Sequence, residues 1–183
     1  MNKVHPLHDN EWAELEKIWS PVTYKRKMVL TVAGEVERYL YFVIEGVQRA
    51  FYVDDSHPEA TIVFTYAGSF SGVADSFLTR QPSRYFLETL TSSTMLRTSY
   101  LHIQELMDKH QNIERWVRIA TSYAMRGVLE RQIELLTFSA EEKFRALLQR
   151  SPHVLQLIPH KYLASYLGID ASTFSKLLST VRI

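Results

Sequence analysis

A short stretch near the C-terminus, LASYLGIDASTFSKLL (163–178), carries hydroxyl groups and one cation at helical spacing. The residues that could contact a nucleic acid here are Ser172, Thr173, Ser175 and Lys176. Hydroxyl groups can donate or accept hydrogen bonds at base edges and phosphates, and the ammonium group of Lys176 can reach a guanine edge or a phosphate. These side chains can act together only if they lie on the exposed side of one helix.

The apolar and small residues around them are spaced as in a helix-turn-helix. Gly168 would form the turn, because glycine takes the left-handed conformation at low cost, and the carboxylate of Asp170 would cap the second helix. We expect helices over 160–167 and 171–181. The residues that would pack these helices together are Leu163, Ala164, Leu167, Ile169, Phe174 and Leu177. An ordinary helical hairpin is the alternative interpretation.

If the module binds DNA, the start of its second helix enters the major groove. Lys161 and Tyr162, at the start of the first helix, would then contact the DNA backbone. Residues 143–183 carry six cations and one anion, a net charge of +5, whereas the other 142 residues carry 15 cations and 19 anions, a net charge of −4. This asymmetry indicates an anionic partner for the C-terminal segment, with a solvated helical surface as the alternative.

The rest of the chain lacks the patterns expected of a metal-dependent or nucleophilic enzyme. It has no cysteine, which excludes disulfides, thiolate chemistry and cysteine-ligated metals. Of its seven histidines only His57 lies in the strand-rich region, so no pair there has metal-ligand spacing. No G-x-S-x-G or Walker motif is present. We predict no catalytic residue and no metal ligand, and a cupin-like enzyme is the least favoured alternative.

The elements that must position these residues change in character along the chain. Residues 9–19 have the periodicity of an amphipathic helix. From residue 23 to about residue 100 the sequence is rich in β-branched and aromatic residues and is broken at short intervals by turn formers, which is typical of a sandwich or barrel. The expected strands are 39–54 (two strands joined at Glu45–Gly46), 59–68, 83–90 and 94–100.

A long helix is predicted over 112–137, which contains neither proline nor a turn cluster, and a shorter one over 139–150. The long helix would extend more than about 35 Å. Its apolar residues are Ile113, Trp116, Val117, Ala120, Tyr123, Ala124, Val128, Ile133 and Leu136. A stripe of this length is either core or a seam with a partner helix, and we favour a homodimer seam.

A family resemblance rests on the order of the elements. It is carried by two segments, EVERYLYFVIEGVQRAFY (35–52) and GSFSGVADSFLTRQPSRYFLETL (68–90), and by the two helical parts that follow them. In this order the elements resemble the Crp–Fnr family of bacterial transcription regulators over nearly the whole chain. The resemblance implies an α+β fold. An N-terminal antiparallel β-roll (a double-stranded β-helix of the cyclic-nucleotide-binding type) would occupy 1–111, a dimerisation helix 112–137 and a helix-turn-helix 138–183.

The resemblance also implies a pocket, whose candidate residues are Phe70, Gly72, Val73, Ala74, Ser83, Arg84 and Tyr123. Members that bind cyclic nucleotides hold the phosphate at the start of a short helix, neutralise it with an arginine and bind the ribose with a glutamate. Here the glutamate position is Val73 and the arginine position is Ser83, with Arg84 one residue later and therefore on the opposite face of a strand. Losing the cation costs about 3–5 kcal/mol, so we expect weak or absent cAMP binding.

These observations predict a homodimeric, DNA-binding transcription regulator without catalytic activity. The N-terminal stretch MNKVHPLHDNEW has no apolar signal region, and no run of about 18 apolar residues occurs, so we expect a cytoplasmic protein that does not enter a membrane. The resemblance implies a palindromic operator with half-sites about 34 Å apart, and RNA polymerase as a further partner. We expect no cofactor other than an unidentified small-molecule effector. The main alternative is a small-molecule sensor or scaffold that keeps the fold without binding DNA.

Overall fold

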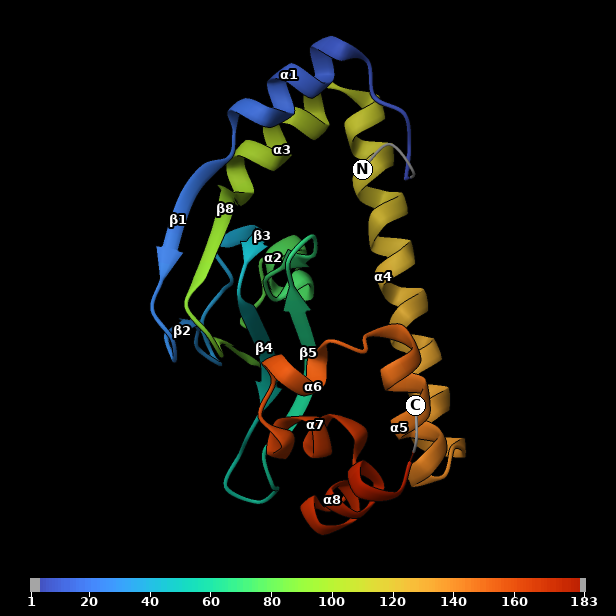
Figure 1. Ribbon diagram of the computed structural model, residues 1–183. Helices are drawn as coiled ribbons and strands as arrows, with labels where there is room; N and C mark the ends of the chain where they lie inside the picture. The colour runs from blue at the N-terminus through green and yellow to red at the C-terminus, as the bar shows by residue number, and fades with distance from the viewer. Residues whose placement is uncertain (1–3, 182–183) are drawn as a thin grey trace.

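The chain consists of a roll of strands, one long helix and a group of short C-terminal helices (Figure 1), in a computed structural model that describes residues 4–181. The strands are β1 (Ser20–Tyr24), β2 (Val29–Thr31), β3 (Tyr39–Glu45), β4 (Val47–Tyr52), β5 (Ala60–Tyr66), β6 (Phe70–Ser71), β7 (Phe86–Thr89) and β8 (Ser93–Ser99). The helices are α1 (Asp9–Lys17), α2 (Ala74–Thr79), α3 (Tyr100–Lys109), α4 (Gln111–Thr137), α5 (Ala140–Arg150), α6 (Val154–Leu157), α7 (His160–Leu167) and α8 (Ala171–Thr180).

The strands form two four-stranded antiparallel sheets, in the orders β1-β8-β3-β6 and β2-β7-β4-β5. The predicted pair of strands joined at Glu45–Gly46 is confirmed, but the two strands do not pair as a hairpin, because the turn carries the chain from the first sheet into the second. Gly46 has a φ of 96°, and a Cβ at this position would lie 2.5 Å from the backbone oxygen of Ser92. Only glycine can therefore close this turn without moving the neighbouring loop.

Alternation along the strands separates an inner from an outer layer of apolar residues. Tyr41, Val43 and Met95 are buried between the two sheets and form the core of the roll. Leu40 and Phe42 point the opposite way, as alternate residues of a strand must, toward the side covered by α1, α3 and α4. The roll thus has one core inside itself and contributes to a second core under these helices.

Helix α4 divides its apolar residues between two faces, unlike the single stripe predicted from the sequence. Ile113 and Trp116 are buried, and Ala120 lies on the same side toward the roll. Ile133 and Leu136 are exposed, and at about 100° per residue they lie on the other side of the helix. The N-terminal half of the stripe is therefore core of its own chain, and only the C-terminal half is available to a partner. Within residues 4–181 no helix is both long and apolar enough to cross a membrane.

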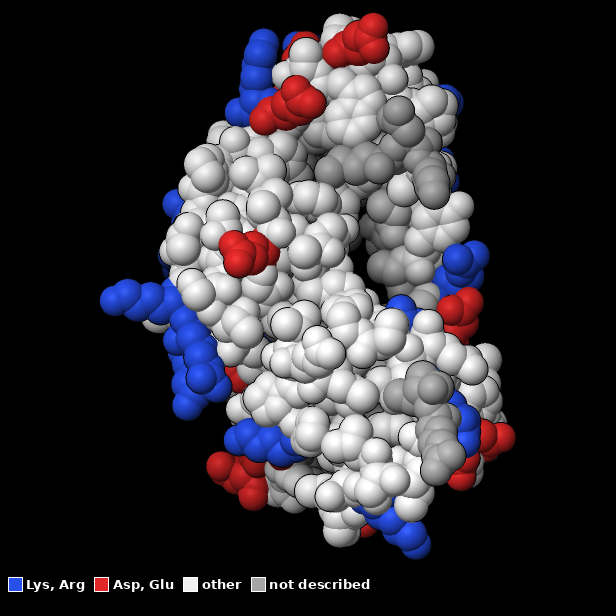
Figure 2. Space-filling view, viewed as in Figure 1, with Lys and Arg blue, Asp and Glu red and all other residues white. Residues whose placement is uncertain are grey.

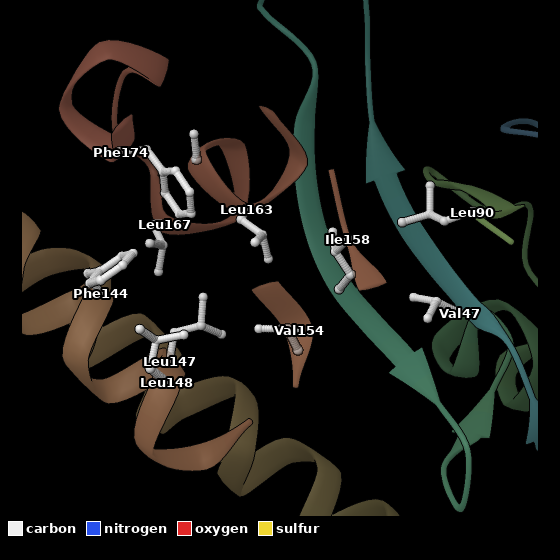
Figure 3. Close-up of a cluster of buried hydrophobic side chains, with 11 residues drawn as sticks. Val47, Leu90, Phe144, Leu147, Leu148, Val154, Ile158, Leu163, Leu167 and Phe174 are labelled. Carbon is white, nitrogen blue, oxygen red and sulfur yellow. The ribbon is translucent and has the colours of Figure 1, made fainter. Parts of the chain in front are cut away.

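The C-terminal helices enclose a third core, whose side chains point toward one another in Figure 3. Its buried residues from these helices are Phe144, Leu147, Leu148, Val154, Ile158, Leu163, Ala164, Leu167 and Phe174. Val47 of β4 and Leu90, next to β7, belong to the same cluster. The helical module (α5 to α8) is therefore packed against the roll and is not held by α4 alone. The predicted domain boundaries after residues 111 and 137 stay predictions, although α4 itself runs from Gln111 to Thr137.

Candidate functional site

The predicted helix-turn-helix is formed by α7 and α8, with its turn at Gly168. Gly168 has a φ of 63°, and the backbone N–H groups of Gly168 and Ile169 donate to carbonyls in the last turn of α7 at 3.1 Å. The expectation for Asp170 is wrong, because within residues 4–181 its carboxylate makes no capping hydrogen bond. The Asp170 side chain stays in solvent, and its backbone carbonyl begins the helix by accepting from the N–H of Phe174 at 2.9 Å.

Three of the four predicted contact residues on α8 face solvent. They are Ser172, Ser175 and Lys176. Thr173 is half-buried, because it lies one turn before Leu177, on the side of the helix that packs against the module core. Lys161, at the start of α7, is exposed. The exposed set therefore combines two hydroxyl groups with two ammonium groups.

Tyr162, predicted to contact the DNA backbone, faces the roll instead. The guanidinium carbon of Arg49, on β4, lies 3.7 Å from the centroid of the Tyr162 ring and 4.2 Å from that of Phe51. Arg49 is only 2% exposed, and it donates to Glu88 at 2.5 Å and to Glu59 at 2.6 Å. We call Arg49, Glu59, Glu88 and Tyr162 the roll joint. Because its ring covers this buried cation, Tyr162 is committed to the joint rather than to the surface.

A pair of hydrogen bonds places α7 on the edge of β5, beside the roll joint. The hydroxyl of Ser165 accepts from the backbone N–H of Thr61 at 2.9 Å and donates to the backbone carbonyl of Glu59 at 3.1 Å. The rings of Phe64 and Tyr166 pack next to these bonds with centroids 5.2 Å apart. Since β5 is an edge strand, α7 satisfies and covers main-chain groups that a sheet edge leaves unpaired.

A second group of charges, which we call the helix joint, ties the module to α4 and consists of Arg131, Glu134 and Arg150. Glu134 accepts from Arg131 at 2.9 Å and from the two terminal nitrogens of Arg150 at 2.6 and 2.9 Å. Arg131 also donates to the backbone carbonyl of Tyr166 on α7. Burial alone would raise the pKa of Glu134, but the hydrogen bonds from Arg150 and Arg131 outweigh burial and hold the pKa below its ordinary value.

The pocket region predicted from the sequence surrounds α2 and the loop that follows it. Gly72 joins β6 to α2, and Val73 is buried in the inner core of the roll. Ser83 is also buried, and its hydroxyl donates to the backbone carbonyl of Tyr85 at 2.7 Å. Arg84 is exposed, so the positive charge one residue later lies in solvent and not inside the roll.

A buried carboxylate that no sequence pattern singled out lies at the start of α2. Glu37 is 2% exposed, and its Oε2 accepts from the backbone N–H of Val73 at 3.1 Å and from the hydroxyl of Thr31 at 2.5 Å. Its Oε1 accepts from the backbone N–H groups of Arg38 and Tyr39 at 2.9 and 3.1 Å. Four donors therefore compensate the desolvation of this carboxylate.

The side chains of the remaining predicted pocket residues lie outside the inner core of the roll. Phe70 and Ala74 line a cavity between the roll and α4. Tyr123, on α4, is exposed, and its ring centroid lies 5.1 Å from the guanidinium carbon of Arg126. The seven candidates are thus divided among the roll, this outer cavity and the surface. In the part of the chain that the structure describes, no group of three or more histidine, aspartate or glutamate side chains could hold a metal ion.

Comparison with known proteins shows which domain and which fold this arrangement resembles. The family model of the cyclic nucleotide-binding domain matches residues 21–110. No curated protein matches the sequence. The solved structure of FixK2 from Bradyrhizobium japonicum has a TM-score of 0.79 at 15% identity, over 88% of this chain and 83% of that chain. A protein from Eubacterium rectale described as a regulator of the Crp–Fnr family has a TM-score of 0.72 at 13% identity, over 94% of this chain and 82% of that chain. For the catabolite activator protein of Thermus thermophilus the TM-score is 0.60 at 19% identity, over 96% of this chain and 84% of that chain. The chain has the Crp–Fnr fold.

The family resemblance predicted from the sequence is therefore confirmed. The resemblance matches α2 to the short helix of the nucleotide cassette, and Glu37 accepts from the N–H of Val73, just before that helix. Sequence analysis missed both Glu37 and Arg49. Arg49 could have been noticed, because a cation in the middle of the apolar strand VQRAFY indicates a buried ion pair. No local pattern reveals Glu37, because it meets Val73 only after the chain has passed through four further strands.

Proposed function

We propose that this protein is a homodimeric transcription regulator that binds DNA through α8. The observation that carries the proposal is the close packing of α8 on α7 through Phe174, which leaves Ser172, Ser175 and Lys176 on the solvent side. The first turns of such a helix enter the major groove. We assign base contacts to Lys176 and the two serines, and we assign no catalytic residue.

The charges of the module support a phosphate partner. Lys161 and Lys176 are exposed, and within residues 4–181 neither forms an ion pair. By contrast Arg145, on α5, is paired with Glu141 at 2.8 Å. Lys161 is therefore available to a phosphate, whereas Tyr162 is not proposed as a DNA contact, because its ring belongs to the roll joint. Arg182, counted in the basic segment of the sequence, lies outside the described residues.

We infer that two copies associate through the outward face of α4. The apolar residues on this face are Met125, Leu129, Ile133 and Leu136, which are 51–76% exposed. They recur at intervals of three or four residues, the spacing of a coiled-coil seam. At about 100° per residue this face lies opposite Ala120 and Arg131, which face the chain's own roll and helical module. A two-fold dimer would present two α8 helices to adjacent half-sites of a palindromic operator.

We propose that the cassette does not bind a cyclic nucleotide. The carboxylate of Glu37 already accepts from the N–H of Val73, at the start of the short helix where binding members of the family hold the phosphate. A phosphate placed there would be repelled by this buried charge. Ser83 occupies the arginine position and supplies no cation to offset the repulsion. The residues present therefore do not fit a cyclic phosphate, and any effector must bind elsewhere.

Selection of genomic DNA fragments on the purified protein at low salt tests the DNA proposal. We expect enrichment of a palindromic sequence, and we expect Lys176→Ala to bind that sequence at least about tenfold more weakly, because a base contact contributes about 1–3 kcal/mol. Lys17→Ala, which removes an exposed lysine from α1, is the matched control and should bind normally. No enrichment, with or without cell extract, would show that the protein does not bind specific DNA.

The dimer is tested by sedimentation equilibrium of Leu129→Glu. Two carboxylates forced into an apolar seam should weaken association at least about a hundredfold, or about 3 kcal/mol. Leu101→Glu makes the same change at an exposed position of α3 and should leave association unchanged. Unaltered dimerisation of Leu129→Glu would exclude the outward face of α4 as the seam.

Calorimetric titration with cAMP and cGMP tests the cassette. We expect no binding by the wild type or by Ser83→Arg, because Glu37 would pair with the new arginine. The double variant Ser83→Arg, Glu37→Ala restores the cation and removes the competing carboxylate, and it should gain affinity for cAMP. Micromolar binding by the wild type, or by Ser83→Arg alone, would contradict the role assigned to Glu37.

The second candidate function is a small-molecule sensor or scaffold that does not bind DNA. It is favoured by the sparse α8 surface, which offers two hydroxyls and one ammonium, and by the fixed position of α7 on the roll. The same selection separates the two functions, because a scaffold would enrich no sequence at any salt concentration. A contact with RNA polymerase would follow only from the first function.

A further inference from the structure

A cavity of about 610 Å³ lies outside the roll, between its outer face and α4. Its walls come from α1, from α2 and the neighbouring strands, and from the N-terminal half of α4. A hollow separates α4 from the roll in the space-filling view of Figure 2. The volume lies in the range of about 300–1,000 Å³ that is usual for small-molecule sites.

Aromatic side chains dominate the walls of this cavity. All three tryptophans of the chain, Trp12, Trp19 and Trp116, line it. Phe70 joins two of them, with ring centroids 6.1 Å from Trp19 and 5.7 Å from Trp116, and it also contacts Phe42 at 5.3 Å. These rings offer a rigid apolar surface to an aromatic or aliphatic ligand.

The electrostatics of the cavity exclude an anionic ligand. Among the described residues that line it there is no lysine, arginine or histidine, and apart from the indole N–H groups the polar side chains are those of Glu16 and Thr121. A phosphate or carboxylate would enter an apolar site without a cation and would meet the charge of Glu16. An uncharged ligand pays no such penalty, and it could donate one hydrogen bond to Glu16 or Thr121.

The cavity is separate from the nucleotide cassette. Gly72, Val73 and Ser83 do not line it, whereas Phe70 and Ala74, on either side of Gly72 and Val73 in the sequence, do. Neighbouring residues of the cassette segment thus point into two different spaces. The inner one contains the Glu37 carboxylate and the core of the roll, and the outer one is the aromatic cavity.

We propose that the aromatic cavity binds an uncharged, largely apolar small molecule of one to three rings or of comparable aliphatic size. Its role as the effector of the regulator rests on the function proposed above. The ligand would touch both the roll and α4, and α4 reaches the helical module through the helix joint. A side chain of a second copy does not explain the cavity, because Ala120 and Ala124 face it from the side of α4 opposite the proposed seam.

Titration with the uncharged fluorescent probe N-phenyl-1-naphthylamine, in the absence of DNA, tests the proposal. We expect saturable binding of one probe per chain at micromolar concentration. Because every tryptophan lines the cavity, the probe should quench most of the intrinsic fluorescence. Ala120→Phe and Ala124→Phe place a ring in the cavity and should each weaken probe binding at least about tenfold.

Two controls keep the result specific to the cavity. Ala13→Phe adds the same ring to an exposed position of α1 outside the cavity, and it should bind the probe normally. Leu129→Glu changes only the outward face of α4, and it too should bind normally. No saturable binding by the wild type, equal binding by both cavity-filling variants, or loss in Leu129→Glu would each overturn the proposal. Failure of DNA selection would leave these measurements unaffected and would refute only the regulatory role.

Discussion

The roll joint and the helix joint hold the same helical module, but they differ in how far their charges are removed from water. Arg49 of the roll joint is 2% exposed and is covered by two aromatic rings. In the helix joint the side chain of the shared group, Glu134, is 12% exposed, and each joint has one half-exposed member, Arg150 at 44% and Glu59 at 40%. A buried ion pair that loses one partner leaves an uncompensated charge, whereas an exposed pair is replaced by water at little cost. We therefore expect the loss of Arg49, the more deeply buried of the two shared groups, to cost more stability than the loss of Glu134.

This difference bears on how the proposed ligand of the aromatic cavity could act. The aromatic cavity lies between the roll and α4, so a ligand that enters it acts on the relative position of these two parts. The helix joint, whose shared carboxylate is less buried than Arg49, would adjust first. The roll joint would keep α7 on β5 through the same change, because Arg49, Ser165 and the paired rings all act at that edge.

Arg49→Ala tests the stronger joint and should have the largest effect. It leaves Glu59 and Glu88 without their cation and removes the stacking partner of Tyr162, so the free energy of unfolding should fall by about 3–5 kcal/mol. Urea denaturation followed by circular dichroism measures this loss. Arg38→Ala, an exposed arginine of the same roll, should change stability by less than about 0.5 kcal/mol. A loss of under about 1 kcal/mol for Arg49→Ala would remove the distinction between the joints.

The sequence was sufficient to predict the elements within the module but not the roll joint. Helix α7 has the predicted bounds, and Phe174 packs as its spacing predicted, because both follow from local periodicity and from the turn at Gly168. Tyr162 was assigned to DNA because its place at the start of a helix gives no sign of a contact with a strand more than 100 residues earlier. Such a contact depends on how the modules dock, which periodicity does not describe.

Glu134→Gln tests the weaker joint. It keeps the shape of the side chain and removes the charge that accepts from Arg131 and Arg150, so the free energy of unfolding should fall by about 2 kcal/mol. Glu141→Gln removes the carboxylate of the exposed pair with Arg145 and should cost less than about 1 kcal/mol. If Glu134→Gln lowers the free energy of unfolding as much as Arg49→Ala does, burial does not determine how much each joint contributes to stability.

The pH dependence of the stability difference between wild type and Glu134→Gln tests whether the charge of Glu134 is responsible. The pKa of Glu134 is lower in the folded protein than its ordinary value of about 4.3. The stabilisation by its charge is therefore complete above about pH 4.3 and is lost as the pH falls through the folded-state pKa. Urea denaturation at decreasing pH should show the difference between wild type and Glu134→Gln shrinking toward zero below that range. A constant difference down to strongly acidic pH would mean that charge is not what Glu134 contributes.

The pocket was predictable only in part, for a related reason. The serine at the arginine position and the valine at the glutamate position were visible in the sequence, and both side chains are buried in the roll. The division of the candidates between two spaces was not visible, because it depends on the turn from β6 into α2, where Phe70 faces outward and Val73 inward. Glu37 lies just before β3, and it contacts Val73 only because the roll closes.

Ser165→Ala should produce the smallest of these effects and separates the hydrogen bonds at the β5 edge from the Arg49 ion pairs. The variant leaves the N–H of Thr61 and the carbonyl of Glu59 without their partner, which should lower the free energy of unfolding by about 1 kcal/mol. Ser175→Ala makes the same exchange at an exposed position of α8, and it corrects for the higher helix propensity of alanine. Equal stability of the two variants would mean that the hold of the roll on α7 comes from Arg49 and the aromatic rings alone.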